Sequence, residues 1–407
     1  MCKKAIFILT LVFWVAPGFI KTALTQHIWS SEKDENYQQA YFVEDDGKVG
    51  AKVADKKDPN TKNHHHVLPN PSTKAPDVFA LSKITYNELK GIDSEHEKIP
   101  INAESNWMDE EQLSEFLKLN FGMFIHFNMA TYNNAQWVVG YLDPSVFDPG
   151  VETIDTDAWA DAAVAAGMKY AVLTTKHVSG FCLWDSKYTT YDVMNPNCQY
   201  QKDLVGQFIK SFTERGLKVG LYYCWRHPGF DANKPNGTYK VLPPECDPST
   251  HSIEEQIDFQ IAQIKELLTK YPEVFYIWND ALDPEVMEAK EIMTFLREVR
   301  PDIIASANWW DWSKKGTPYA DIAVTETRHF PEDNDVMGET CWKLEDQWFW
   351  NGNTETKSAA SIIEVLEKVN ARKANLLLNV GPDKNGNILP QSEKTLIELG
   401  ELLNSSN

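Results

Sequence analysis

The hydrophobic pattern divides the chain into a polar N-terminal part and a longer part with regular apolar runs. Residues 27–75 are polar, with stretches such as KKDPNTKN and PNPST, and no apolar period survives in them. From Trp107 onward, short apolar runs alternate with amphipathic ones. A polar stretch without apolar periodicity cannot bury a core. We therefore predict a polar, largely disordered linker over residues 26–105 and a folded domain over residues 106–407.

Eight of the apolar runs have the length of strands, and the runs between them have helical spacing. The strand-like runs are nearly continuous, which is typical of a parallel sheet covered on both faces. In DLVGQFIKSFTERG, residues Leu204, Phe208 and Phe212 share a helical face, and Gly216 closes the helix. The predicted strands are 121–128, 170–175, 218–224, 274–280, 303–309, 321–326, 339–344 and 375–382. The predicted helices are 109–119, 157–167, 203–215, 253–271, 285–300, 358–373 and 391–403.

This order of elements predicts an α/β fold, namely an irregular (β/α)8 TIM-like barrel. The barrel is irregular because the segments between the fifth, sixth and seventh strands are too short for full helices. The main alternative is a doubly wound open sheet, which usually carries a Gly-rich phosphate loop after its first strand. The segment FGMFIHFNMATYN contains no such loop, so we favour the barrel.

Acidic and aromatic residues stand at the ends of the predicted strands, where a barrel carries its active site. In EVFYIWNDALDPE the core strand stops at Asp280, and packing gives no reason for a carboxylate there. Because the C-terminal ends of barrel strands meet at one mouth, these side chains are expected to converge. They are His126, Lys176, His177, Tyr222, Tyr223, Trp278, Asn279, Asp280, Glu326 and, at the start of the seventh strand, Glu339.

Several of these residues also have a purely structural interpretation. Asp280 could cap the following helix, although Asp283 is better placed for that role. A lone His126 in an apolar strand could be a core histidine. Glu326 and Glu339 could be ordinary solvated acids.

Two carboxylates beside imidazoles and aromatic rings suit glycoside hydrolysis. One carboxylate attacks the sugar or stabilises positive charge there, and the other protonates the leaving oxygen, so no cofactor is needed. A metal-dependent hydrolase is the alternative. However, FIHFN has one histidine where such barrels commonly have two, and neither a Cys pair nor HExxH supports zinc. We expect neither a cofactor nor a metal.

Five segments resemble, in order, the α-L-fucosidases of glycoside hydrolase family 29. They are FGMFIHFNMATYNNAQW, KYAVLTTKHVSGFCLWDSKYTTYD, DLVGQFIKSFTERGLKVGLYY, YIWND and NLLLNVGPDKNG. The resemblance implies a retaining exo-α-L-fucosidase that removes terminal α-L-fucose through a covalent fucosyl-enzyme. The family nucleophile falls on Asp280. The sugar-binding residues that the resemblance implies are His126, Trp137, His177, Tyr223 and Trp278.

The resemblance leaves two candidates for the catalytic acid/base, whose position varies within the family. One version places it in a Trp-Glu segment, which falls on Glu339 with Gly338 in place of the Trp. Another version places it nearer the nucleophile, which selects Glu326. We favour Glu339 and retain Glu326.

The sequence also departs from the family pattern. Val178 replaces the second of two adjacent histidines, and SANWWDW replaces a segment that carries an arginine near the sugar. Arg328 could compensate for that arginine. The family commonly appends a β-sandwich, and we expect none before Asn407. The departures keep two alternatives open: a fucose-binding barrel with little or no turnover, and a retaining glycosidase for a related sugar.

Charge narrows the class of partner. The 407 residues carry a formal net charge of −20. Nucleic-acid binding relies on Lys and Arg contacts to phosphates, so this charge argues against a nucleic-acid partner. The expected partner is instead a fucosylated oligosaccharide or glycoprotein glycan. The sequence carries no signal for an oligomeric state.

The first residues, MCKKAIFILTLVFWVAPGFIKTALTQ, predict a signal peptide over residues 1–25 and a secreted or periplasmic protein. The apolar run is short for a membrane span, so we expect no span after cleavage, with a retained anchor as the alternative. Without Cys2, five of the six cysteines remain, and an odd number is no disulfide scaffold. Cys198 and Cys246 are a candidate pair.

Overall fold

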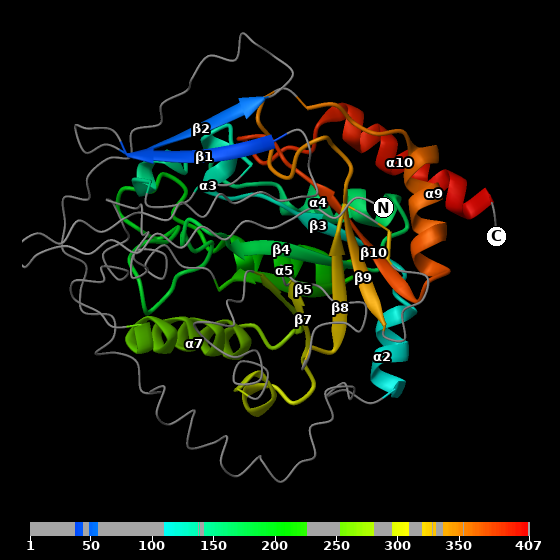
Figure 1. Cartoon of the computed structure of the whole chain (residues 1–407), viewed down its shortest axis with the longest axis horizontal. Helices are drawn as coiled ribbons and strands as arrows, with labels where there is room; N and C mark the ends of the chain where they lie inside the picture. The colour runs from blue at the N-terminus through cyan, green and yellow to red at the C-terminus, as the bar shows by residue number, and fades with distance from the viewer. Residues whose placement is uncertain are drawn as a thin grey trace, which may run out of the picture.

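A closed barrel of eight parallel strands forms the centre of the protein (Figure 1). The computed structural model describes 110–136, 138, 142–225, 253–280, 295–308, 320–327, 329–330, 337–352 and 354–405, together with the backbone of 37–43 and 49–55. Around the barrel the strand order is β10-β3-β4-β5-β6-β7-β8-β9. The strands are β3 Phe121–Ile125, β4 Tyr170–Lys176, β5 Lys218–Cys224, β6 Val274–Asp280, β7 Ile304–Asn308, β8 Ile322–Glu326, β9 Gly338–Lys343 and β10 Ala374–Val380. The predicted (β/α)8 architecture and all eight strands are confirmed.

Helices surround the barrel, most of them on its outside and α2 at one end (Figure 1). They are α2 Glu110–Leu117, α4 Thr156–Ala165, α5 Leu204–Glu214, α7 Ile253–Lys270, α9 Ala359–Asn370 and α10 Pro390–Ser405, with the short α3 Met129–Tyr132 and η2 Pro144–Val146. Of the predicted helix 285–300, only its last residues are described, and 295–299 are helical. In the part of the chain that the structure describes, no helix is both long and apolar enough to cross a membrane.

The structure describes one pair of strands inside the predicted linker. β1, Tyr37–Val43, lies antiparallel to β2, Val49–Asp55. The sequences of the two strands, YQQAYFV and VGAKVAD, each contain apolar residues. The rest of the linker and the predicted signal peptide lie outside the described residues.

Side chains alternate between the inside and the outside of the barrel, as the pleat of a strand requires. Tyr222 and Trp278 belong to a compact apolar cluster inside the barrel. Their sequence neighbours Tyr223 and Ile277 belong to a larger cluster between the strands and the helices. Adjacent residues of one strand therefore face different surroundings. Only those that point inward can reach the open end of the barrel.

Helix α2 closes the N-terminal end of the barrel. The Phe116 ring lies 5.9 Å from Tyr170, the first residue of β4, and 5.4 Å from Tyr276 of β6. Asn375 Nδ2, near the start of β10, donates to the Phe116 carbonyl at 2.8 Å. The C-terminal ends of the strands, at the opposite end, are thus the open mouth.

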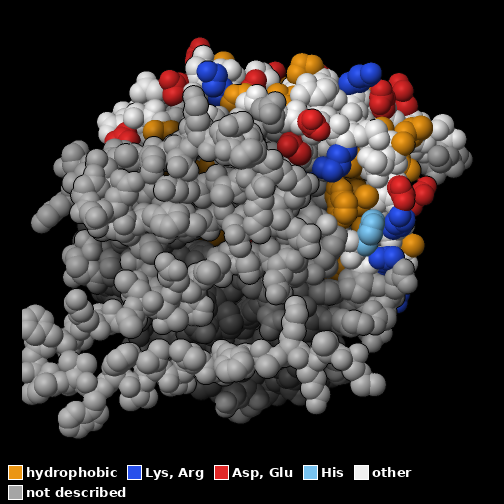
Figure 2. All heavy atoms as spheres, turned by 45° about the horizontal axis from the view of Figure 1, so that its top comes forward, with side chains coloured by type: hydrophobic (Ala, Val, Ile, Leu, Met, Phe, Trp, Pro, Cys, Tyr) orange, Lys and Arg blue, Asp and Glu red, His pale blue; other side chains and the backbone are white. Residues whose placement is uncertain are grey.

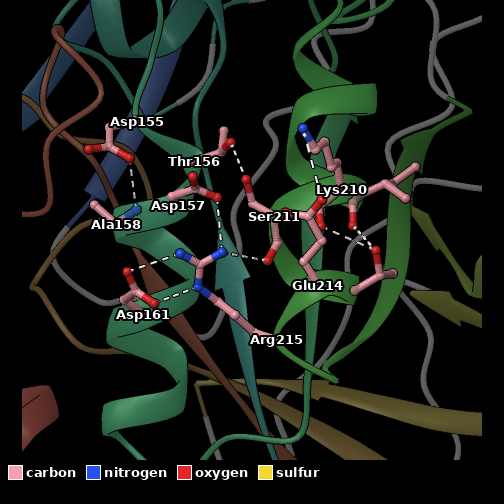
Figure 3. A network of polar contacts seen from close by, with 11 residues as sticks. Asp155, Thr156, Asp157, Ala158, Asp161, Lys210, Ser211, Glu214 and Arg215 are labelled. Carbon is pink, nitrogen blue, oxygen red and sulfur yellow. Dashed lines mark hydrogen bonds and ion pairs between the residues drawn. The ribbon is translucent and has the colours of Figure 1, made fainter.

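Polar contacts join the outer surfaces of α4 and α5 (Figure 3). Arg215 donates to Asp157 at 2.9 Å and to Asp161 at 2.5 Å, and Asp155 caps α4 by accepting from Ala158 N at 2.9 Å. Exposed ion pairs of this kind each contribute little, about 0–1 kcal/mol. The described surface in Figure 2 shows the same character, with acidic and basic side chains interspersed rather than gathered by sign.

The close packing of α10 on α4 predicts that one added methyl group destabilises the fold. A Cβ atom on Gly400 would lie 1.8 Å from the carbonyl oxygen of Ala165, so the helices must separate in Gly400→Ala. We expect a loss of roughly 1–3 kcal/mol in the free energy of unfolding, measured by urea titration. The control is Glu401→Ala, at an exposed position on the same helix. Equal stabilities of the two variants would contradict the close approach.

Candidate active site

Two carboxylates lie at the C-terminal ends of the two strands on either side of β7. Asp280 is the last residue of β6, Asn308 of β7 and Glu326 of β8. Asn308 Nδ2 donates to Asp280 Oδ1 at 2.9 Å and also donates to Glu326 Oε1. Because one nitrogen contacts both groups, the two bonded oxygens are at most roughly 6 Å apart. This separation suits a pair of carboxylates that act on one glycosidic bond.

The second oxygen of Asp280 is held by a tyrosine. The Tyr222 hydroxyl, on β5, donates to Asp280 Oδ2 at 2.5 Å. Burial, and then the charge of Asp280, raise the pKa of Tyr222 well above its usual range, so the phenol stays a donor. Asp280 therefore accepts from two neutral donors, Tyr222 and Asn308, and these bonds favour its ionised form.

Two neutral imidazoles line the mouth beside this carboxylate. The ring centroids of His126 and His177 are 6.1 Å apart, and His177 stacks on Tyr222 at 5.5 Å. Burial lowers the pKa of His177 to about 3, and that of His126 well below its usual range. Each ring therefore offers both a donor and an acceptor nitrogen at neutral pH. His126 Nδ1 is buried and has no hydrogen-bond partner among the described atoms.

Aromatic side chains after β9 complete the wall. The Trp348 and Phe349 rings lie 5.1 and 5.0 Å from the His126 ring, and Phe349 also lies 5.0 Å from His177. Lys343, the last residue of β9, places its ammonium 5.6 Å from the Trp348 ring centroid. Within the described chain, His, Cys, Asp and Glu side chains form no group of three or more that could hold a metal ion. The mouth thus combines apolar faces with hydrogen-bonding groups, as sugar binding requires.

Tyr223 does not lie in this group, which corrects the prediction from the strand end. Its hydroxyl donates to Gln263 Oε1 of α7 at 2.8 Å and accepts from Lys176 Nζ at 3.1 Å. The alternation along β5 turns Tyr223 to the helical layer and Tyr222 to the mouth. Tyr222 is therefore the tyrosine of this strand that contacts the candidate nucleophile.

Glu339 also lies elsewhere than predicted. It is the second residue of β9 and pairs with Val324, two residues before Glu326, so it lies below the mouth inside the barrel. It is fully buried, and its carboxylate accepts from Tyr170, Tyr276 and Trp278 at 2.5, 3.0 and 2.9 Å. The expectation that it converges with Asp280 fails because a parallel strand presents its last residues, and not its first, to the mouth.

Comparison with known proteins assigns the family. The family model described as alpha-L-fucosidase matches residues 92–407. The chain belongs to the alpha-L-fucosidase family. The resemblance seen in the sequence motifs is thereby confirmed, and a pair of carboxylates at the mouth accords with a family of glycoside hydrolases.

Relatives within the family are distant and longer. Alpha-L-fucosidase 1 of Arabidopsis thaliana is 27% identical over 315 residues, which cover 70% of this chain and 58% of that protein. Tissue alpha-L-fucosidase of Bos taurus is 26% identical over 270 residues, covering 61% and 52%. The chain thus spans only a little over half the length of these curated relatives.

Solved fucosidase structures share the fold. Alpha-L-fucosidase isoenzyme 1 from Paenibacillus thiaminolyticus superposes with a TM-score of 0.61 at 29% identity, over 74% of this chain and 76% of that one. A family 29 alpha-L-fucosidase from Bacteroides thetaiotaomicron superposes with a TM-score of 0.62 at 22% identity, over 75% and 77%. The second likeness concerns the barrel alone.

Other features of the fucosidase motif are only partly described. Trp137 and Arg328 lie outside the described residues. Trp278 lies inside the barrel and stacks on Tyr222 at 5.3 Å. Cys198 is a buried thiol that donates to the Phe147 carbonyl at 3.6 Å, and its candidate partner Cys246 lies outside the described residues.

Sequence reasoning missed some of the residues at the mouth. Asn308, Trp348 and Phe349 contact the predicted site residues, yet none of them was predicted to act there. The alternation of side chains along β7 could have predicted Asn308. Ile304, Ser306 and Asn308 lie on the same inward face of this strand, and Asn308 is its last residue. No comparable signal marks the two aromatic residues, which follow β9 in a loop.

The buried Glu339 predicts a pH dependence of stability. Burial raises its pKa from the ordinary 4.5 to about 7. The folded protein therefore retains a proton that the unfolded chain releases above pH 4.5. The contribution of Glu339 is fully present below that pH and is lost as pH rises towards 7, by of the order of 3 kcal/mol at most.

Urea titrations of the wild type and Glu339→Gln at a series of pH values measure this contribution. Between pH 4.5 and 7 the free energy of unfolding of the wild type should fall relative to that of Glu339→Gln. Glu345 also has a raised pKa of about 7, but it is present in both proteins and cancels in the difference. A difference that does not change across this range would contradict the shift.

Proposed function

We propose that the protein is a retaining exo-α-L-fucosidase that hydrolyses terminal α-L-fucose from glycans. The observation that carries the proposal is the pair Asp280 and Glu326, joined by Asn308 at the mouth of a fucosidase-family barrel. Support for a covalent step comes from a Bacteroides thetaiotaomicron fucosidase of the same fold, whose structure is described as a trapped covalent intermediate. The substrate is a fucosylated oligosaccharide or glycoprotein glycan.

In the first step, Asp280 acts as the nucleophile. Its carboxylate oxygen forms a bond to the anomeric carbon of fucose while the bond to the aglycone oxygen breaks. Glu326 gives its proton to that departing oxygen. Tyr222 and Asn308 hold the attacking carboxylate in place through the hydrogen bonds described above.

In the second step, water releases the sugar. Glu326, now ionised, takes a proton from a water molecule as the water oxygen attacks the anomeric carbon. The ester bond to Asp280 breaks, and both carboxylates return to their starting forms. Two inversions at one carbon leave the configuration of fucose unchanged.

We assign the acid/base role to Glu326 rather than Glu339 because of access. The carboxylate of Glu326 contacts the same amide as the nucleophile, whereas that of Glu339 is fully buried and accepts three hydrogen bonds inside the barrel. A general acid must come within hydrogen-bond reach of the leaving oxygen. Among the described residues Glu339 is enclosed, which favours Glu326 for this role.

Fucose binding is assigned to the groups around this pair. His126 and His177, both neutral, exchange hydrogen bonds with hydroxyls, and Trp348 and Phe349 supply an apolar wall. Trp278 forms the floor beneath Tyr222. Trp137 is assigned to the same pocket from the sequence motif.

Hydrolysis of 4-nitrophenyl α-L-fucoside tests the function directly. We expect release of nitrophenol from this substrate and none from the matching α-galactoside or β-xyloside. Preferred turnover of another glycoside would favour the related-sugar alternative. Calorimetric binding of L-fucose without turnover of any fucoside would instead favour a binding barrel, which the replacement of a family histidine by Val178 permits.

We also propose that the protein is secreted or periplasmic. The proposal rests on the basic start and apolar run of the first 25 residues. N-terminal sequencing of the protein purified from its natural source tests it. A mature N-terminus near Thr25 supports export, and an intact Met1 contradicts it.

A further inference from the structure

Glu339 is a buried carboxylate that the proposed reaction does not use. Its Oε1 atom accepts from Trp278 Nε1 at 2.9 Å and from the Tyr276 hydroxyl at 3.0 Å. Its Oε2 atom accepts from the Tyr170 hydroxyl at 2.5 Å. All three donors are neutral, and each belongs to an aromatic residue inside the barrel. The Glu339 carboxylate therefore holds these three aromatic side chains together through hydrogen bonds.

The barrel backbone makes room for this arrangement. A Cβ atom on Gly122 would lie 2.5 Å from the Tyr170 ring, and one on Gly220 would lie 3.1 Å from Tyr276 Cβ. Both glycines are strand residues, where a side chain normally stabilises the sheet. Because neither glycine has a side chain, there is room for the two tyrosines to reach across the barrel to Glu339.

The network is connected to the nucleophile through one indole. Trp278 stacks on Tyr222 with ring centroids 5.3 Å apart and an interplanar angle of 23°. Tyr222 in turn donates to Asp280 at 2.5 Å. A lateral shift of the indole would displace Tyr222, and with it the hydrogen bond that orients the attacking oxygen.

We propose that Glu339 is a positioning residue that fixes the Trp278 indole beneath the nucleophile. The inference rests on the proposed function for its link to catalysis, but the contact with the indole can be tested without turnover. Glu339 acts on Asp280 only through Trp278 and Tyr222, so its effect must disappear when the indole is removed. This positioning role accounts for a buried carboxylate at position 339 that does not act as the acid/base.

The choice of replacement separates positioning from charge. Gln at position 339 keeps an oxygen for Trp278 and Tyr276, and its amide can donate to the Tyr170 oxygen. Ala removes the acceptor from all three side chains. A positioning role thus predicts that Glu339→Gln preserves the geometry and that Glu339→Ala loses it.

A double-mutant cycle on kcat with 4-nitrophenyl α-L-fucoside tests this prediction. Glu339→Ala should lower kcat by roughly 10- to 100-fold, as a displacement near 1 Å can do, while Glu339→Gln stays within about threefold. In a Trp278→Phe background, Glu339→Ala should add less than about threefold. Equal effects of Glu339→Ala in the two backgrounds would overturn the proposal.

A control separates positioning from simple loss of stability. Asp321 is also a fully buried acid, and it accepts from the Ala305 backbone and from Arg297 near the start of β8. Asp321→Asn should be destabilised without any fall in kcat, when both are measured well below the unfolding midpoint. If Glu339→Ala also keeps wild-type kcat under these conditions, its role is structural and the proposal fails.

A second readout does not depend on activity. With 15N-labelled Trp, the indole signal missing from Trp278→Phe identifies Trp278. In Glu339→Ala this signal should shift and broaden, because the indole loses its acceptor, and in Glu339→Gln it should stay sharp. An unchanged Trp278 signal in Glu339→Ala overturns the positioning role, even if the wild type turns over no fucoside and the proposed function fails on its own.

Discussion

Replacing Asp280 by Asn should lower kcat on 4-nitrophenyl α-L-fucoside by at least ~10³-fold, or about 4 kcal/mol of transition-state stabilisation. Asn has nearly the same shape, and its oxygen can accept from Asn308 while its amide donates to the Tyr222 oxygen, so the fold should be unaffected. What it lacks is an anionic oxygen able to form the bond to the anomeric carbon. Asp185→Asn, at an exposed acid, is the control.

A smaller side chain makes this first prediction more specific. In Asp280→Ala, azide can occupy the space left by the carboxylate and attack the anomeric carbon from the same side. Because this is a single inversion, the product should be β-L-fucosyl azide. Turnover of Asp280→Asn within tenfold of the wild type, or azide rescue that yields the α-azide, would contradict a nucleophilic Asp280.

Replacing Glu326 by Ala should lower kcat on a fucosylated oligosaccharide by about 10²- to 10⁴-fold, the usual contribution of general acid catalysis. The loss should be smaller for 4-nitrophenyl α-L-fucoside, because nitrophenolate leaves without a proton. The basic limb of the pH profile should also disappear, since that limb reports the loss of the proton that Glu326 donates.

The comparison with Glu339 decides between the two acids. Glu339→Gln removes the acidic proton at that position while keeping hydrogen-bond partners for Trp278. We expect kcat within about threefold of the wild type and an unchanged basic limb for this variant. A larger loss in Glu339→Gln than in Glu326→Ala would return the acid/base role to Glu339.

The sequence predicted the barrel because each of its strands is buried on both faces. Continuous apolar runs such as YAVLTT and NLLLNVGP are uncommon outside such strands, and helical spacing between them left few other topologies. The position of Asp280 followed from the same logic, since a carboxylate that ends a core strand needs a role outside packing.

The errors within the candidate site have a common physical origin. Tyr222 and Tyr223 are adjacent and chemically identical, and only the pleat of β5 decides which one faces Asp280. Glu326 and Glu339 are both acids in strands, and only their opposite positions along β8 and β9 separate them. Residue type predicted the chemistry. The side of a strand on which a residue lies, and its height in the barrel, depend on how the strands pair around the closed barrel, and the sequence of one strand does not specify that pairing.

Identification of the residue that carries the covalent sugar tests the central claim most directly. The protein would be incubated with 2-fluoro-fucosyl fluoride, digested with pepsin and analysed by tandem mass spectrometry. The account predicts one added fluorofucosyl group, on Asp280 in the peptide that contains YIWND. A label on Glu326 or Glu339, or hydrolysis that yields β-L-fucose as the first product, would contradict it.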